Sequence, residues 1–217
     1  MLVSIITLFP EIFEVFSQSS IIGKAQKNKL LEIRFINLRN WGLGKHKQVD
    51  DRPFGGGAGM LLRVDVVYNA LNATKIKSKD PNFSEKTVLL DPKGKTFSQN
   101  LAYNLSKLDH LILICGHYEG IDHRIDKFID AKISIGEYIL TGGEIPAMVV
   151  TDAVARLIPG VLRNPESLDE ESFSKNIRAE APQFTRPFEF MKRKVPEILL
   201  SGNHSKIKAW KISKSKK

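Results

Sequence analysis

Apolar residues occur in short runs that alternate with amphipathic segments along the chain. Residues 2–8 (LVSIITL), 30–38 (LLEIRFINL), 87–91 (TVLLD) and 110–115 (HLILIC) have the length and composition of buried strands. Two further short strands are predicted at 131–135 and 137–140. Helical periodicity predicts helices over 11–25, 63–75, 98–108, 121–129 and 145–158. This alternation predicts an α/β fold with a mostly parallel sheet and helices on both faces.

Composition narrows the class of protein further. The 217 residues, 42% of them hydrophobic, are enough for one core and a small second domain. Cys115 is the single cysteine, which excludes an internal disulfide and favours a reducing compartment, so a cytoplasmic location is expected. The N-terminal apolar run has strand length and lacks the basic region and cleavage site of a signal peptide. No apolar run reaches the roughly 18 residues of a membrane helix.

Positive charge is concentrated at the C-terminal end. The net charge is +9, and residues 191–217 contain nine Lys or Arg and one Glu, together with His204 and Trp210. Such a segment is typical of a surface that contacts a nucleic-acid backbone. Charge alone equally allows a solubilising tail or a patch for anionic membranes.

Three glycine-bearing loops each follow a predicted strand: DPKGK after Leu90, GHYEG after Cys115 and TGGE after Leu140. Ligands of open α/β sheets bind beyond the carboxyl ends of the strands, so the loops indicate one small-molecule pocket, although each could be an ordinary tight turn. Neither a Walker loop nor a dinucleotide fingerprint is present. The five histidines form no close chelating pair, so no metal site is predicted. With phosphate-binding motifs and a metal site excluded, we expect a reaction that uses an activated cofactor and a positioned general base.

Several longer blocks carry a family resemblance. They are TLFPEIF (7–13), HKQVDDRPFGGGAGML (46–61), CGHYEGID (115–122), SIGEYILTGGEIPAM (134–148), ARLIPGVL (155–162) and VPEILLSGNH (195–204). From residue 1 to about 211 the chain resembles the bacterial tRNA (guanine-N1)-methyltransferases, the TrmD family of the SPOUT class. The resemblance implies a deep trefoil knot in a methyltransferase domain (1–160), a flexible linker (161–175) and a small, mainly helical, basic tRNA-binding domain (176–217), shortened here. It also implies a homodimer with the active site at the subunit interface.

The resemblance further assigns binding residues. S-adenosylmethionine would be held by Leu90, Pro92, Gly94, Gly116, Tyr118, Glu119, Ile135, Gly136, Glu137, Tyr138, Ile139, Leu140, Gly142, Gly143 and Pro146. Substrate tRNA would meet His46, Asp50, Arg52, Gly55, Gly56, Gly57, Gly59, Ser172 and Arg186. A glycine-rich pocket suits a ligand read by backbone groups, because close approach requires missing Cβ atoms. The family also suggests a magnesium requirement without a fixed protein site.

The implied reaction is methylation of N1 of the guanine just 3′ of the anticodon, in tRNAs where another guanine precedes it. Guanine N1 must lose a proton, which requires a general base, and charge developing on O6 requires a cation or a hydrogen-bond donor nearby. Arg156 matches the family arginine that stabilises the charge on O6. The family base is an aspartate in an E-D-S-F block, and DEESF places Glu171 at that position.

Three interpretations of this departure compete: Glu171 serves as the base, Asp169 replaces it after a two-residue slip, or the enzyme is slow. Without the resemblance, the acidic run would be interpreted as a solvated linker. Other departures are His117, where Arg is common, and Asp91 and Lys93, where Ser and Gln are common. A non-catalytic RNA-binding protein, and a knotted methyltransferase acting on ribose 2′-OH or ribosomal RNA, are the rival functions.

Overall fold

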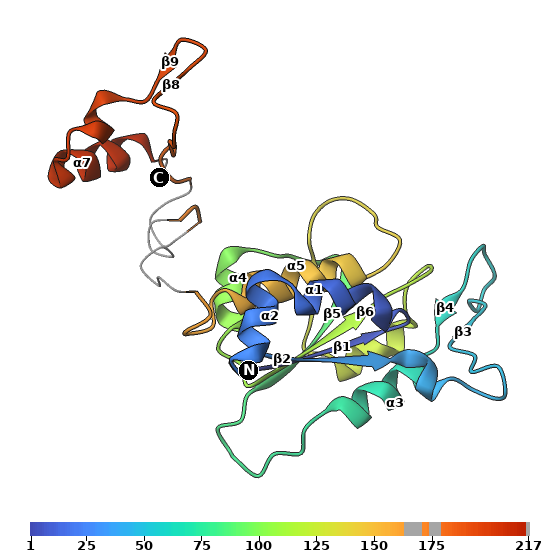
Figure 1. The fold of residues 1–217 in the computed structure, drawn as a ribbon. Helices are drawn as coiled ribbons and strands as arrows, with labels where there is room; N and C mark the ends of the chain where they lie inside the picture. Colours follow the sequence, from blue (N-terminus) through green and yellow to red (C-terminus); the bar gives the residue numbers. More distant parts are fainter. Residues whose placement is uncertain (163–170, 174–178, 216–217) are drawn as a thin grey trace. The chain divides into compact units, whose positions relative to one another are not determined.

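Five parallel strands form the central sheet, in the order β2-β1-β6-β5-β7 (Figure 1). In this computed structural model the described residues are 1–162, 171–173 and 179–215. The strands are β1 (Leu2–Thr7), β2 (Glu32–Asn37), β5 (Glu85–Thr96), β6 (His110–Cys115) and β7 (Ala131–Ser134). The predicted α/β class with a mostly parallel sheet is therefore confirmed.

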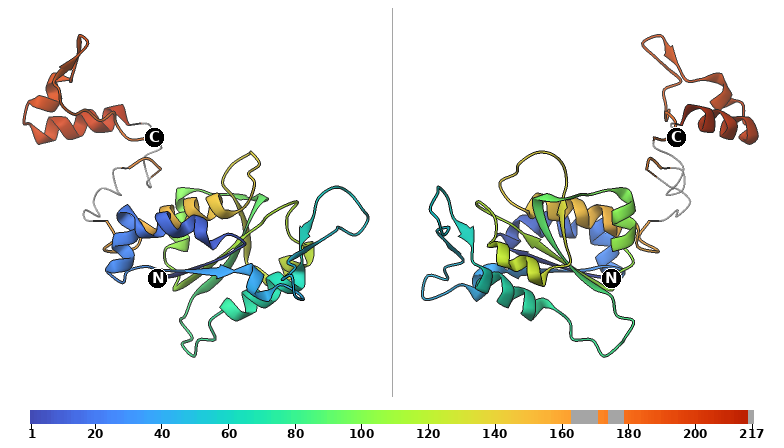
Figure 2. Two further views of the ribbon diagram at one scale, coloured as in Figure 1. Left: turned by 45° about the vertical axis from the view of Figure 1, so that its right-hand side comes forward. Right: turned by 180° about the vertical axis from the view of Figure 1, so that it is seen from behind.

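Helices cover both faces of the sheet (Figures 1 and 2). One face packs against η1 (Pro10–Phe13), α1 (Glu14–Gln18), α2 (Ser20–Lys27), α4 (Gln99–Leu105) and α5 (Glu144–Ala155), and the other against α3 (Val64–Thr74), η2 (Leu38–Trp41) and η3 (His123–Phe128). The central strand β6 is apolar from Leu111 to Cys115 because both of its faces are covered. Leu111 and Leu113 face the first layer, whereas Ile112 and Ile114 face the second.

Several predicted elements differ from the structure. The helix expected over 11–25 is divided into η1, α1 and α2, because Ser19 is extended and Ser20 has a φ of 51°. Residues 121–129 form only the 3-10 turn η3. The DPKGK segment, expected as a loop, lies within β5, whose register against β7 shifts between Leu90 and Lys95. Residues 137–140 are not a strand.

The chain divides into two compact units, Met1–Leu162 and Arg163–Lys217. The first also contains a small hairpin of β3 (Asp50–Asp51) and β4 (Leu61–Leu62), whose connecting loop extends away from the sheet (Figure 2). The second contains the hairpin β8 (Glu189–Phe190) and β9 (Arg193–Lys194), the turn η4 (Glu197–Leu200) and helix α7 (His204–Lys214). Most of the predicted linker lies outside the described residues, and the predicted domain bounds stay a prediction.

Among the described helices, none combines the length and the apolar character needed to cross a membrane.

Candidate active site

A cavity of about 590 Å³ lies where β6 and β7 end, beside the middle of β5. The three segments that wall it follow these strands or, for β5, continue within the strand beyond Leu90. Of the residues predicted to bind the methyl donor, all but two line it: Leu90, Pro92, Gly116, Tyr118, Glu119, Ile135, Gly136, Tyr138, Ile139, Leu140, Gly142, Gly143 and Pro146. The structure thus brings these residues together, and their role in binding stays a prediction.

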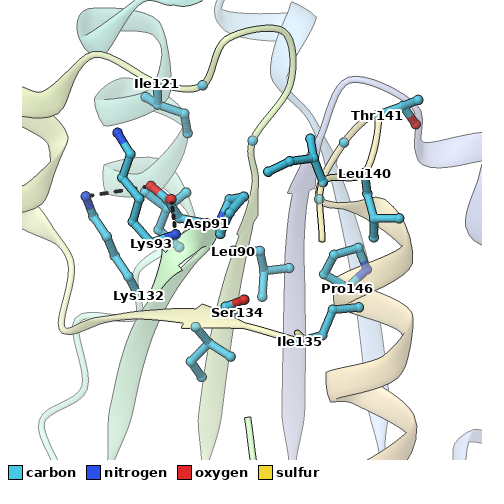
Figure 3. Close-up of a pocket in the computed structure, with 18 of the residues that line it drawn as sticks. Leu90, Asp91, Lys93, Ile121, Lys132, Ser134, Ile135, Leu140, Thr141 and Pro146 are labelled. Carbon is cyan, nitrogen blue, oxygen red and sulfur yellow. Dashed lines mark hydrogen bonds and ion pairs between the residues drawn. The ribbon is translucent and has the colours of Figure 1, made fainter. Parts of the chain in front are cut away.

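The charged side chains gather on one side of the cavity (Figure 3). Leu140 and Pro146 lie on one side, while Asp91 and Lys93 lie on the other with Lys132. The Nζ atom of Lys132 is 3.8 Å from Oδ2 of Asp91, and Oδ1 of Asp91 accepts a hydrogen bond of 2.8 Å from the backbone N–H of Lys93. A mainly apolar cavity of this size with a few placed polar groups suits a small organic ligand.

Lys132 was missed by the sequence reasoning. It lies in the short strand β7, directly before the buried residues Ile133 and Ser134, and its Nζ is also 2.7 Å from Oδ2 of Asp126. The sequence did offer a signal for Lys132: a lysine in a strand at the edge of the sheet where ligands bind needs an acidic partner or a ligand.

Two glycines hold the cavity walls close together. A Cβ on Gly143 would lie 2.6 Å from Cα of Cys115, and the Gly143 N–H donates a 2.8 Å hydrogen bond to the Gly116 carbonyl. A Cβ on Gly94 would lie 2.5 Å from the backbone nitrogen of Ile133. Gly94 therefore does not line the cavity as expected but allows β5 to approach β7. Glu137, the other residue predicted for the donor site, also lies outside the lining.

Cys115 packs against Gly143 of the cavity wall, and its burial explains why its thiol should be unreactive. The thiol is buried, and its pKa is raised well above the ordinary value by burial and by the nearby carboxylate of Glu144. A thiol in this state is a poor nucleophile, which agrees with a packing role.

The glycine-rich loop between β3 and β4 contains most of the residues predicted to meet tRNA. Gly55, Gly56 and Gly57 have positive φ values, and no atom lies within 4 Å of the position that a Cβ would take on any of them. Gly59 instead lies against the side chain of Glu119, and the backbone N–H of Glu119 donates a 3.1 Å hydrogen bond to the carbonyl of Met60. The end of this loop therefore packs on the cavity wall.

Three other residues of this region have exposed or partly exposed positions. Asp50 is half-buried in β3, and His46 and Arg52 are exposed. Phe54 is 99% exposed at the loop and was not singled out from the sequence, although an aromatic residue between an arginine and three glycines is itself a signal for RNA contact.

The remaining predicted residues lie at the end of α5 or in the second unit. Arg156 is the half-buried residue that ends α5. Glu171, Ser172 and Arg186 belong to the second unit, in which the Ser172 hydroxyl accepts a 3.0 Å hydrogen bond from the backbone N–H of Glu180. Asp169 lies outside the described residues. Within the described parts of the chain, no group of side chains is suited to hold a metal ion.

Comparison with known proteins identifies the family. The model described as "tRNA (Guanine-1)-methyltransferase TrmD" matches residues 1–217. The chain belongs to this family. The curated tRNA (guanine-N(1)-)-methyltransferase of Clostridium botulinum (strain Alaska E43 / Type E3) is 51% identical over 211 residues, which cover 97% of this chain and 86% of the relative. That of Clostridium perfringens (strain SM101 / Type A) is 48% identical over 215 residues, with coverages of 99% and 88%. That of Alkaliphilus oremlandii is 50% identical over 218 residues, with coverages of 99% and 87%.

These findings confirm the resemblance inferred from the sequence blocks, and with it the prediction that the chain is an enzyme, a methyltransferase of the TrmD family.

Proposed function

We propose that the chain transfers a methyl group from S-adenosylmethionine to N1 of a guanine in tRNA, the guanine just 3′ of the anticodon where another guanine precedes it. The observation that carries the proposal is the cavity at the ends of β6 and β7 beside the middle of β5, to which the glycine loop 52–60 is joined through Gly59 and Glu119. The residues proposed to bind the donor and the glycine loop proposed to meet the substrate are thereby neighbours in a single unit of the fold.

The residues of the cavity fit this donor. Gly116, Gly142 and Gly143 line the cavity, so their backbone groups can read the edge of an adenine. Leu90 and Leu140 offer apolar contact for the thioether portion. The donor, when bound, supplies a methyl group on a positively charged sulfur, which needs no further activation by the protein.

The chain must then manage one proton and one developing charge. As the N1–CH₃ bond forms and the sulfur–methyl bond breaks, the N1 proton passes to a carboxylate, for which we propose Glu171. The guanidinium of Arg156 would stabilise negative charge on O6. Because Glu171 belongs to the second unit, its role requires that unit to reach a donor cavity, and we propose that it reaches the one of the partner subunit in a homodimer.

The finer features of the family belong to the same proposal. They are a deep trefoil knot around the cavity loops, a cytoplasmic location and a magnesium ion that enters without a fixed protein site. The basic segment 191–215, with Arg193 and Lys194 in β9 and several lysines on α7, would contribute phosphate contacts.

Methyl transfer to a tRNA transcript with the guanine pair tests the proposal. Wild type, Glu171→Gln and the matched control Glu180→Gln are compared, using labelled S-adenosylmethionine and mass spectrometry of the nucleosides. We expect 1-methylguanosine from wild type and from the control, and a loss of at least about 100-fold in the Glu171 variant.

Each other result has a defined meaning. Undiminished transfer by Glu171→Gln would move the base elsewhere, with Asp169 the next candidate. Methyl on a ribose 2′-OH would refute the assigned target atom. Absence of transfer together with absence of donor binding would support the non-catalytic RNA-binding alternative.

A further inference from the structure

The glycine loop 52–60 depends on its two ends for its position. Near its last residues, the backbone N–H of Glu119 donates a 3.1 Å hydrogen bond to the carbonyl of Met60. In its middle, residues 55–57 have positive φ values, and no atom of the described chain lies within 4 Å of a Cβ added to any of them. The direction in which the loop leaves the fold is therefore set where it begins.

The beginning of the loop is held by the carboxylate of Asp51, the second residue of β3. Its Oδ1 accepts a 2.8 Å hydrogen bond from the backbone N–H of Arg52, the first residue of the loop. Its Oδ2 accepts a 3.0 Å hydrogen bond from Nη1 of Arg63, the residue directly before α3. One carboxylate thereby connects a guanidinium on the far strand of the hairpin to the main chain of the loop.

Arg63 is itself fixed by the first turn of α3. Its Nε donates a 3.1 Å hydrogen bond to Oδ1 of Asp65, and its Nη2 donates a 2.9 Å hydrogen bond to Oδ2 of the same carboxylate. Such a two-pronged pair fixes the plane of the guanidinium, and it lowers the pKa of Asp65. The backbone N–H of Arg63 also donates a 2.9 Å hydrogen bond to the carbonyl of Val49. Arg63 thus offers Nη1 to Asp51 from a fixed position.

These contacts are too exposed to matter much for stability. The side chain of Asp51 is 56% exposed and that of Arg63 is 29% exposed, and water screens an ion pair in such a place. Their effect is on geometry: they fix the main chain at Arg52, which is exposed and begins the loop. A contact of this kind should influence what the loop binds rather than whether the protein folds.

We propose that Asp51 and Arg63 are positioning residues for the glycine loop. Arg63 orients the carboxylate of Asp51, and this carboxylate holds the main chain of Arg52. The guanidinium of Arg52 is thereby presented to a phosphate of the substrate tRNA. The role toward tRNA rests on the proposed function, whereas the anchoring of the loop does not.

The sign of the effect distinguishes positioning from charge. Asp51 is a negative charge beside a loop that is proposed to meet a polyanion, so by charge alone its removal should strengthen tRNA binding. Positioning predicts the opposite, weaker binding. Arg63 could instead contact a phosphate directly, and its removal would then weaken binding whether or not Asp51 is present.

A double-mutant cycle on methyl transfer to a tRNA transcript, at one fixed salt concentration, tests the positioning role. Wild type, Asp51→Ala, Arg63→Ala and the double variant are compared. We expect each single variant to raise the KM for tRNA about fivefold, with kcat and the KM for S-adenosylmethionine near wild type. The double variant should raise it no further, because both changes break the same connection. Arg34→Ala, which breaks an exposed ion pair with Glu32, is the matched control and should leave all three constants near wild type.

The other results of the cycle would overturn the proposal. They are an unchanged or lowered KM for tRNA in Asp51→Ala, and a double variant in which the two effects multiply. A lower kcat with unchanged KM values would indicate only a loss of folded enzyme, which is not positioning. Should an alanine variant not fold, as judged by urea unfolding, Asp51→Ser or Arg63→Gln takes its place.

Nitrogen-15 relaxation of the ligand-free protein tests the anchor without tRNA. We expect the order parameter of the Arg52 amide to be about 0.8 in wild type and in Arg34→Ala, and below about 0.6 in Asp51→Ala and Arg63→Ala. Equal order parameters in all four proteins would overturn the proposal. If wild type transferred no methyl group to tRNA, the proposed function would fail together with the role toward tRNA. The order parameters would still decide whether Asp51 and Arg63 position the loop.

Discussion

A methyl group added to Gly59 should reveal how the glycine loop is joined to the wall of the cavity beside β5. Gly59 has a φ of 84°, and its added Cβ would meet Cγ of Glu119, with Oε1 at 2.6 Å and Cδ at 2.9 Å. The backbone conformation costs a non-glycine residue about 1–2 kcal/mol, and forcing Glu119 from its rotamer costs about 1 kcal/mol more. We therefore expect Gly59→Ala to lower the free energy of unfolding by about 2–3 kcal/mol.

Gly56→Ala is the matched control for this prediction. Its φ of 82° is nearly the same, but no atom lies within 4 Å of the added Cβ, so only the backbone cost of about 1–2 kcal/mol applies. Urea unfolding followed by circular dichroism measures both variants in wild-type and Glu119→Ala backgrounds. Without the Glu119 side chain, the two glycine variants should cost the same. Equal costs in the wild-type background, or an excess for Gly59 that persists in Glu119→Ala, would refute the reasoning.

Three further predictions concern the core and the pH dependence of stability. Gly143→Ala places a Cβ 2.6 Å from Cα of Cys115, where main chain cannot move aside, so urea unfolding should show a loss of about 3 kcal/mol; a loss under about 1 kcal/mol would contradict this. Cys115, whose pKa is raised by burial, should resist iodoacetamide at pH 8 in the folded protein and react after unfolding in urea, and rapid labelling of the folded protein would contradict its burial. The backbone N–H and the hydroxyl of Ser84 lower the pKa of Asp109. The folded state therefore binds fewer protons than the unfolded state, and the free energy of unfolding falls as the pH drops below 3.8, the ordinary pKa of Asp. Asp109→Asn should remove part of that fall in acid unfolding curves, and an unchanged curve would contradict the prediction.

The strands of the sheet could be predicted from sequence because they are buried on both faces. Residues 110–115 contain apolar side chains for both helical layers, so the run is continuous and its ends coincide with those of β6. The segment 137–140 shows the limit of this signal. Tyr138, Ile139 and Leu140 are 54%, 80% and 37% exposed and belong to the lining of the cavity beside β5. Apolar side chains line this cavity as they fill a core, so the sequence of the segment has the apolar run of a buried strand.

The candidate site was found in outline for a different reason. Carboxyl ends of parallel strands meet at one edge, so the glycine segments DPKGK, GHYEG and TGGE could be assigned to one pocket without knowing side-chain positions, although DPKGK lies within β5 and TGGE does not directly follow a strand. Contacts between loops distant in sequence have no such periodic signal. The packing of Glu119 on Gly59, and the close approach of Gly143 to Cys115, depend on register and crossing geometry that become visible only in the folded chain.

The glycines around the site are of two kinds, which differ in whether other atoms occupy the space of a side chain. Gly94 and Gly143 are required because backbone approaches backbone, so their substitution should act on stability and on the shape of the donor cavity. Gly55, Gly56 and Gly57 have open space where a side chain would be, so nothing within the described fold demands their smallness. Their positive φ values demand it only in part, because a loop this exposed could have taken an ordinary conformation with ordinary residues. Bare main chain facing outward next to a donor cavity is what a closely approaching partner requires, and in the proposed function that partner is the tRNA.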